Sequence, residues 1–414
     1  MKLTTTWCLL IVGSIMTASI PAQDTTGYAV TQLNDHIYEL TIDGGGYTVK
    51  VIASVGKDGI LLVDAGQEGH AEKLRTAVKN LGYDMPKIII NTHAHVEHIG
   101  GNAAWGSAPI IIAHEKVRTR MRSGSFLFNE FPDEALPDIA FSDSLTLHFN
   151  GEEIRLLAFP GAHDNCDIVV WFTASKIVCV AALSNGSHFP SVDEVHGDVN
   201  KYPEVVARVI ASLPEDVRII PGHGEDGTTA DFRKFHEMLV KTADIVRTEV
   251  AKGKDAATLE KDDVLKDWSS FEGSYTDKNT MIDYLVKGLK PRDPRPYVFE
   301  PMYYAIKEKG VDGGIAAYAD LKANHAAEYK FDELPLLVIP YKLFGKERYA
   351  DAVELFEFFL KEYPDGEYAW MAYHNMGRSY MKLGDKDLAR QNLTKSLELN
   401  PDNPRAKQFL EELD

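Results

Sequence analysis

The chain has few cysteines and few basic residues, and both shortages restrict what it can be. Three cysteines in 414 residues are too few for a disulfide framework. Lysine and arginine number 44 against 62 aspartates and glutamates, so the formal net charge is −18. Nucleic acid and anionic membrane surfaces are therefore unexpected partners, because both require clustered cations. The hydrophobic share of 44% instead predicts ordinary cores, and the length allows two or three domains.

Long apolar runs are also missing, apart from a short one near the N-terminus. Lys2 precedes an apolar stretch at residues 7–20, which Pro21-Ala22-Gln23 follows. We interpret residues 1–22 as a signal peptide, because the stretch is too short to span a bilayer comfortably. An N-terminal membrane anchor is the alternative. Export to the bacterial periplasm or to the medium is expected, with no stable membrane span after signal cleavage.

The two cysteines outside this segment, Cys166 and Cys179, fall on adjacent expected strands at residues 167–172 and 177–181. Counting outward from the turn between these strands places Cys179 opposite Val170, with Cys166 farther along. This spacing predicts two buried thiols and no disulfide.

Residues from 28 to about 224 alternate β-branched runs with helical periodicity, which is typical of an α/β domain. Residues 49–54 and 59–64 should pair as strands, residues 70–81 should form a helix, and Asn150-Gly151 should turn a hairpin. After residue 231 the strand signal stops and amphipathic helices follow. The expected domains are an α/β domain at residues 28–250, a helical linker region at 251–332 and helical repeats at 333–414.

The C-terminal residues contain an internal repeat. Tyr373, Gly377, Ala389 and Pro401 fall at the spacings of a 34-residue helix–turn–helix unit, and a weaker copy precedes it. This pattern resembles the tetratricopeptide repeat (TPR). Because about three repeats are needed for stability, the helices before Pro340 should pack against this array. The array would serve either as an extra helical layer or as a surface for a protein or peptide partner.

Histidines follow three expected strands at the point where each strand ends. His93, His95 and His98 come directly after the strand expected at residues 87–91, while His163 and His223 follow two later strands in Pro-Gly turns. Strand ends are where α/β proteins commonly build sites, and neutral imidazole is a standard zinc ligand. Convergence of the three strand ends on one metal is the economical interpretation. Surface histidines with unrelated roles are the alternative.

These motifs, in this order, resemble the metallo-β-lactamase fold superfamily, as does Leu62-Val63-Asp64-Ala65-Gly66. The resemblance covers residues from about 28 to 250. It implies an α/β fold, a four-layer αββα sandwich with a metal site at one edge, followed here by an all-α TPR domain. It also implies a first zinc site of His93, His95 and His163, a second site of Glu97, His98 and His223, and Asp64 supporting the ligands.

The sequence departs from the family mainly at the second site. The family usually has Asp where this chain has Glu97, and very often a bridging Asp where this chain has Ala182; the segment after His163 also differs. Two divalent ions about 3.7 Å apart repel by about 18 kcal/mol at an effective dielectric near 20, which a bridging carboxylate normally offsets. One zinc is therefore expected to bind readily and a second weakly, although some relatives hold two metals without that acid.

The resemblance implies an exported zinc-dependent hydrolase of a small-molecule substrate. Metal-bound hydroxide would attack an ester, lactone, thioester or amide bond, a β-lactam included, with Glu97 as the general base. His188 would either line the pocket or lie exposed on its loop, and His114 would be structural. The acidic charge disfavours a nuclease, and Ala182 disfavours a glyoxalase-type thioesterase. The alternative is a catalytically degenerate metal-binding module that acts through TPR-mediated protein interaction.

Overall fold

The computed structural model describes residues 27–44, 46–124, 130–193, 196–290, 295–401 and 403–413. The expected signal peptide lies outside these residues. In the described part of the chain, every helix is too short or too polar to cross a bilayer.

The first sheet begins as an antiparallel meander and continues as parallel strands. Its first four strands pair antiparallel in chain order, and the next three pair parallel, which requires a crossover between each pair. The expected pairing of residues 49–54 with 59–64 is confirmed. The elements are β1 (Ala29–Gln32), β2 (Ile37–Asp43), β3 (Thr48–Gly56), β4 (Gly59–Val63), η1 (Glu68–His70), α1 (Ala71–Asn80), β5 (Ile88–Asn91), α2 (Val96–Ile99), η2 (Asn102–Trp105), β6 (Ile110–His114), α3 (Glu115–Ser123), η3 (Asp133–Ala135) and β7 (Ile139–Phe141).

The second sheet has the order β13-β12-β11-β10-β9-β8. Asn150 and Gly151 both have positive φ and turn the β8–β9 hairpin, as expected. Val170 pairs with Cys179 across β10 and β11, and the thiols of Cys166 and Cys179 are buried and unbonded to each other. The elements are β8 (Ser144–Phe149), β9 (Glu152–Ala158), β10 (Ile168–Phe172), β11 (Ile177–Ala181), α4 (Tyr202–Ser212), β12 (Arg218–Pro221), β13 (Gly227–Thr228) and α5 (Thr229–Ala251).

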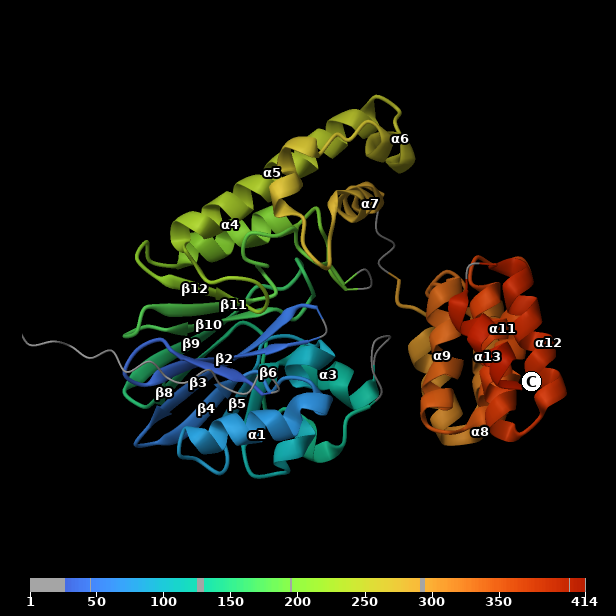
Figure 1. Cartoon of the computed structure of the whole chain (residues 1–414), viewed down its shortest axis with the longest axis horizontal. Coiled ribbons are helices and arrows are strands. Elements are labelled where there is room, and N and C mark those ends of the chain that lie inside the picture. Colours follow the sequence, from blue (N-terminus) through green and yellow to red (C-terminus); the bar gives the residue numbers. More distant parts are fainter. Residues whose placement is uncertain are drawn as a thin grey trace, which may run out of the picture.

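The two sheets pack face to face, and helices cover their outer faces (Figure 1). Aliphatic side chains of both sheets, such as Ile90 and Val170, form the inner core. Leu74 and Val78 of α1 cover the first sheet, while α4 and α5 cover the second. Each strand thus buries one face against the other sheet and one against helices, which explains the near-continuous apolar runs in β4, β5 and β11. The expected αββα sandwich is confirmed.

The region expected as a helical linker divides between two cores. Leu259, Met281 and Leu285 belong to the core under the second sheet, so α6 (Ala256–Lys261), η4 (Lys266–Phe271) and α7 (Lys278–Gly288) complete the first domain. The next helix, α8 (Phe299–Asn324), contributes Met302 and Ile306 to a separate core with the C-terminal helices.

The C-terminal domain is all helical in its described residues and contains the expected repeat. Helices α8 and α9 pack against the following helices through one apolar core, as expected for the segment before the repeat. Gly377 lets α11 and α12 approach closely, because a Cβ there would lie 2.6 Å from Cγ of Leu393. The helices are α8 (Phe299–Asn324), α9 (Glu333–Gly345), α10 (Tyr349–Glu362), α11 (Ala369–Leu383), α12 (Lys386–Leu399) and α13 (Pro404–Leu413).

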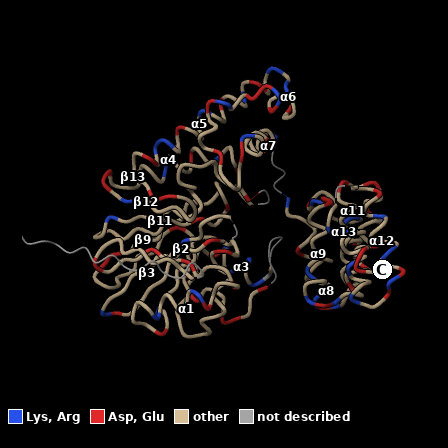
Figure 2. Tube along the Cα trace, viewed as in Figure 1, with Lys and Arg blue, Asp and Glu red and all other residues tan. Residues whose placement is uncertain are grey.

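One glutamate of the first domain contacts the helical domain. Glu130 binds Lys346 at 2.7 Å, Lys307 at 3.1 Å and the hydroxyl of Tyr303 at 3.2 Å. Although burial alone would raise the pKa of Glu130, the two lysines lower it to about 2. Elsewhere Lys and Arg are scattered among acidic residues in both domains (Figure 2).

We expect Gly377→Val to destabilise the helical domain by about 2 kcal/mol, because the added methyl groups collide with Leu393 and the Ala389 carbonyl. Urea unfolding followed by circular dichroism measures this loss. Gly69→Val is the matched control, since no atom lies within 4 Å of a Cβ at that exposed position. Equal stability of the two variants would contradict the close packing of α11 and α12.

Candidate metal centre

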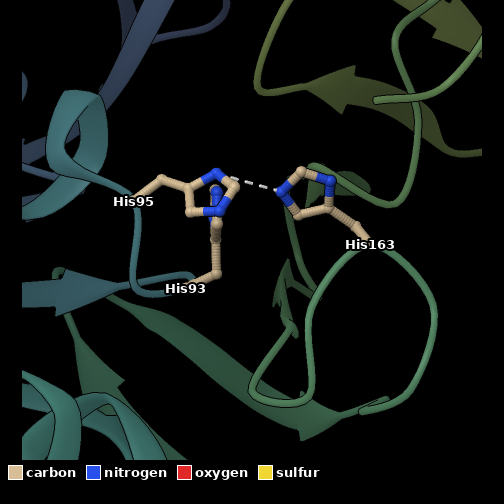
Figure 3. A group of neighbouring side chains, drawn as sticks. All are labelled: His93, His95 and His163. Atoms are coloured by element: carbon tan, nitrogen blue, oxygen red, sulfur yellow. Dashed lines mark hydrogen bonds between the residues drawn. The ribbon is translucent and has the colours of Figure 1, made fainter. Parts of the chain in front are cut away.

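The first cluster forms where β5 and β9 end. His93 and His95 lie on the loop between β5 and α2, and His163 lies on the loop after β9, with all three rings converging (Figure 3). The ring centroids are 4.6–5.0 Å apart, and Nδ1 of His95 lies 3.2 Å from Nε2 of His163. One ligand atom from each residue lies within 4.8 Å of the other two, a spacing that can hold a metal ion.

The second cluster adjoins the first, and the rings of His93 and His98 are 4.3 Å apart. Glu97 and His98 lie on the single-turn helix α2, and His223 follows β12. Nε2 of His98 and Nε2 of His223 are 3.4 Å apart, and a Glu97 oxygen lies 3.9 Å from the latter. These three residues form a second group whose ligand atoms lie within 4.8 Å of one another.

Hydrogen bonds at Nδ1 fix the orientation of the Nε2-ligating rings. Nδ1 of His98 donates to Asp64 at 2.7 Å, that of His163 to the Ser191 carbonyl at 2.9 Å, and that of His223 to the Thr48 carbonyl at 2.7 Å. Because each of these oxygens accepts a hydrogen bond from Nδ1–H, each neutral ring carries its proton on Nδ1 and keeps a lone pair on Nε2. The lone pairs of His98 and His223 face each other and cannot satisfy one another. A cation between them would satisfy both.

His93 provides an independent test of whether a metal fits. Its Nδ1 lies 3.1 Å from the hydroxyl of Thr92, which donates to Asp64 at 2.9 Å. Nε2 of His93 is buried and has no hydrogen-bond partner among the described residues. A buried polar atom of this kind is costly unless a ligand satisfies it. The residues therefore fit a metal ion bound on this side of the loop.

Burial keeps most of these imidazoles neutral, as metal ligation requires. It lowers the pKa of His163 and of His223 to about 4, and it lowers that of His93 well below the ordinary value. For His95, burial acts in the same direction, but Asp193 and Glu97 outweigh it and raise the pKa. Burial would raise the pKa of Glu97, but the neighbouring His98 and His95 lower it, so this carboxylate is ionised at neutral pH.

Asp64 supports two rings from one carboxylate. It binds His98 directly and His93 through Thr92, and it also accepts the backbone N–H of Thr92 at 2.8 Å. Its φ of 68° lies in the left-handed region, which is strained for a residue other than glycine. The loop at the end of β4 thus holds an unfavourable backbone conformation that places this carboxylate under the site.

The altered segment after His163 is held by a residue that the sequence did not single out. Arg120 of α3 donates to Asp164 at 2.6 Å and also to Asn165. Despite burial, Arg120 lowers the pKa of Asp164 to about 2. Asp164 in turn accepts the thiol of Cys166 at 3.3 Å. The departure from the family pattern is therefore an ordered turn with its own buried ion pair.

Asp193 is a second residue that sequence reasoning missed. It lies 3.7 Å from Nε2 of His95 and 2.9 Å from Nδ1 of His196, and the group His95, Asp164 and Asp193 is also close enough to hold a cation. Its backbone N–H donates to the carbonyl of His163. The only sequence signal for Asp193 is its spacing of three residues from His196.

The two substitutions at the second cluster have different consequences. Glu97 does bring its carboxylate within the cluster despite its greater length. Ala182 is buried and offers only its carbonyl, which accepts the hydroxyl of Tyr202. Gly222 leaves room for the ring of His98, because a Cβ there would lie 3.2 Å from Cε1. Ala182 therefore supplies no side-chain oxygen, whereas Glu97 still contributes its carboxylate to the cluster.

A cavity of about 180 Å³ opens beside His223. Tyr47 and Tyr275 pack around this imidazole, each with its ring centroid 5.5 Å away. His188 lines the cavity and is also 36% exposed, whereas His114 caps α3 by accepting the N–H of Lys116. Tyr275 lies between η4 and α7, a segment that carried no signal in the sequence.

Two parts of the chain match family models of known proteins. Residues 44–223 match the family model described as the metallo-beta-lactamase superfamily, and residues 370–403 match the tetratricopeptide repeat. A metallo-beta-lactamase type 2 of Bacteroides fragilis is 23% identical over 208 residues, which are 49% of this chain and 81% of that protein.

Two solved structures are similar to the first half of the chain. A metallo-beta-lactamase from Pontibacter korlensis is 21% identical with a TM-score of 0.45, covering 51% of this chain and 98% of its own. TMB-1 is 18% identical with a TM-score of 0.44, covering 52% and 99%.

We expect Asp64→Asn to weaken metal binding at the second cluster by about 10–100-fold, with a smaller loss at the first. The amide removes the charge that favours the Nδ1–H tautomer of His98. A competition titration with a chromophoric chelator measures both affinities. Asp216→Asn, an exposed aspartate paired with Lys176, is the control. Unchanged affinities in Asp64→Asn would show that this carboxylate does not orient the ligands.

Proposed function

Because the chain carries a domain of the metallo-beta-lactamase superfamily followed by a tetratricopeptide repeat, we propose that it is a zinc-dependent hydrolase of small molecules. The bond cleaved is an ester, lactone, thioester or amide. The observation that carries this proposal is the orphaned Nε2 of His93 beside imidazoles whose lone pairs also face inward. Nitrogen-rich donor sets with one carboxylate suit zinc better than calcium or magnesium.

The ligands would divide between two adjacent positions. His93, His95 and His163 would hold one ion, and Glu97 and His98 with His223 would hold the other. When bound, such an ion supplies Lewis acidity and lowers the pKa of water. Hydrolysis adds the water oxygen to the carbonyl carbon, breaks the bond to the leaving group and passes a proton to that group.

Glu97 is the residue placed to accept a proton during this reaction. Its carboxylate lies 3.7 Å from Nδ1 of His95 and 3.9 Å from Nε2 of His223, so it stands between the two clusters. It is ionised at neutral pH for the reason given above. Tyr47 and Tyr275 pack around the imidazole of His223, each with its ring centroid 5.5 Å away, and line the cavity beside it.

The ordered surroundings of the site favour an enzyme over a degenerate module. Arg120 stabilises the altered segment after His163, and the substituted Glu97 keeps its carboxylate in the second cluster. A protein retaining zinc only for stability would need neither a cavity beside the ligands nor an ionised acid between them. Ala182 remains the feature that supports weak binding of a second ion.

A partner-binding role of the repeat domain is the second candidate function. A groove of about 800 Å³ is lined by α10, α11 and α12, and it presents Tyr373, Met376 and Tyr380 among charged residues. Apolar side chains within a charged rim are typical of peptide grooves. This role is compatible with catalysis in the first domain.

We also propose export to the bacterial periplasm or to the medium. The support is the sequence of residues 1–22, with its cationic start, short apolar run and small residue near the expected cleavage point.

Protein purified without chelator is expected to hold one zinc tightly and a second weakly. The physical reason is the ion–ion repulsion that no bridging side chain offsets at Ala182. Metal analysis after dialysis measures occupancy, with His163→Ala expected to lose the tight ion and His223→Ala the weak one. Two tightly held zinc ions per chain would refute the unequal filling.

A panel of chromogenic esters, lactones, thioesters and a β-lactam tests the hydrolase. We expect at least one to be cleaved, and His95→Ala to lose more than about 100-fold in kcat/KM because a ligand of the first cluster is missing. Activity that persists in His95→Ala would be a contaminant. A wild-type chain that binds zinc and cleaves nothing would favour the non-catalytic role.

A further inference from the structure

The cavity beside His223 restricts the substrate, provided that the proposed hydrolase function holds. Its walls come from segments far apart in the sequence: the turn between β2 and β3, the loops after β11 and β12, and residues 273–276. The last segment lies outside the residues that match the family model, which end at 223. Part of this wall is therefore not determined by the family domain.

Asn185 lines this cavity and carries a side-chain oxygen with no hydrogen-bond partner among the described residues. The residue is 3% exposed, and its Nδ2 donates to the carbonyl of Phe189 at 3.2 Å. Its Oδ1 is buried and has no partner among the described residues. Buried amide oxygens are normally paired, so a donor is expected from a ligand.

The turn that carries Asn185 is held in place by its neighbours. Asn185 and His188 form an isolated β-bridge, which closes the turn. The backbone at Gly224 lies so close that a Cβ there would be 2.7 Å from the Asn185 carbonyl. Because the turn is clamped against the loop that bears His223, the free Oδ1 stays fixed relative to a metal ligand.

The lining carries negative charge and, in its described residues, neither lysine nor arginine. Glu225 lines the cavity, and its carboxylate lies 3.8 Å from Nε2 of His188. The nearby cations Lys50 and Arg218 are engaged with Asp226 at 2.6 and 2.7 Å. A substrate carboxylate in this cavity would therefore meet the carboxylate of Glu225 and no lysine or arginine of the described lining.

Tyr47 and Tyr275 form the remaining wall. Their ring centroids are 4.6 Å apart, and Tyr275 is 39% exposed. An exposed aromatic face beside a hydrogen-bonding site suits a flat or apolar substituent.

We infer that the site takes an uncharged substrate with an N–H or O–H donor beside the scissile carbonyl and an apolar group next to it. The donor binds Oδ1 of Asn185, and the apolar group packs on Tyr275. An N-acylamino ester or thioester has this chemistry. A substrate with a free carboxylate at that position, such as a β-lactam with its ring carboxylate, is discriminated against.

Three ethyl thioesters test this selectivity in the full-length protein loaded with zinc: those of N-acetylglycine, of N-acetyl-N-methylglycine and of succinate. The N-methyl group removes the donor, and succinate replaces the neutral amide with a carboxylate. After correction for spontaneous hydrolysis, kcat/KM is expected to be about 10-fold higher for N-acetylglycine than for its N-methyl analogue, and lowest for succinate.

Asn185→Leu removes the acceptor at similar size and is expected to bring the ratio between the first two thioesters close to one. Asn324→Leu, the same change at an exposed residue of α8, should leave the ratio unchanged. The comparison of the three thioesters uses the unmutated protein, so it does not depend on the folding of any variant. Equal rates for the first two thioesters, or preference for succinate, would overturn the inference and leave the hydrolase standing. Cleavage of none of the three by a protein that cleaves another member of the chromogenic panel would also overturn the inference, whereas only failure on the whole panel counts against the hydrolase.

Discussion

The site depends on where its imidazoles place their Nδ1 protons. His93, His98, His163 and His223 each direct that proton to a fixed acceptor, and the opposite nitrogen of each ring then faces the interior. Those acceptors come from four separate parts of the fold: the loop after β5, the end of β4, the start of β3 and the loop after β11. The imidazoles can therefore take up a metal-binding geometry only when both sheets are correctly packed.

The ligand set could be recognised from the sequence because each ligand follows a strand. Short apolar runs followed by a histidine cluster, by Pro-Gly-x-His or by Pro-Gly-His have few interpretations, and strand ends are where α/β proteins commonly build sites. The register of β10 and β11 was likewise predictable, since a tight turn leaves a single way to count. At the strand-end histidines and along β10 and β11, the local sequence pattern predicted the contacts that the structure contains.

The supporting residues could not be found in the same way. Arg120 is one of several cations on α3, and nothing in its spacing distinguishes the one that turns inward to Asp164. Asp193 and Tyr275 lie in loops, where periodicity gives no information. The boundary of the first domain was equally hidden, because α6 and α7 are amphipathic whichever core they join. Such features follow from long-range packing, which a single sequence does not display.

Tyr275 lies far along the chain from the residues of the candidate metal centre. Every expected metal ligand precedes residue 224, whereas one wall of the adjoining cavity comes from a helical segment some fifty residues later. Insertions, deletions or replacements in that segment would reshape ligand recognition and leave the metal centre intact. A chain shortened to end with α5 would keep all six expected ligand residues, yet it would lose both that wall and the part of the core under the second sheet that α6 and α7 supply.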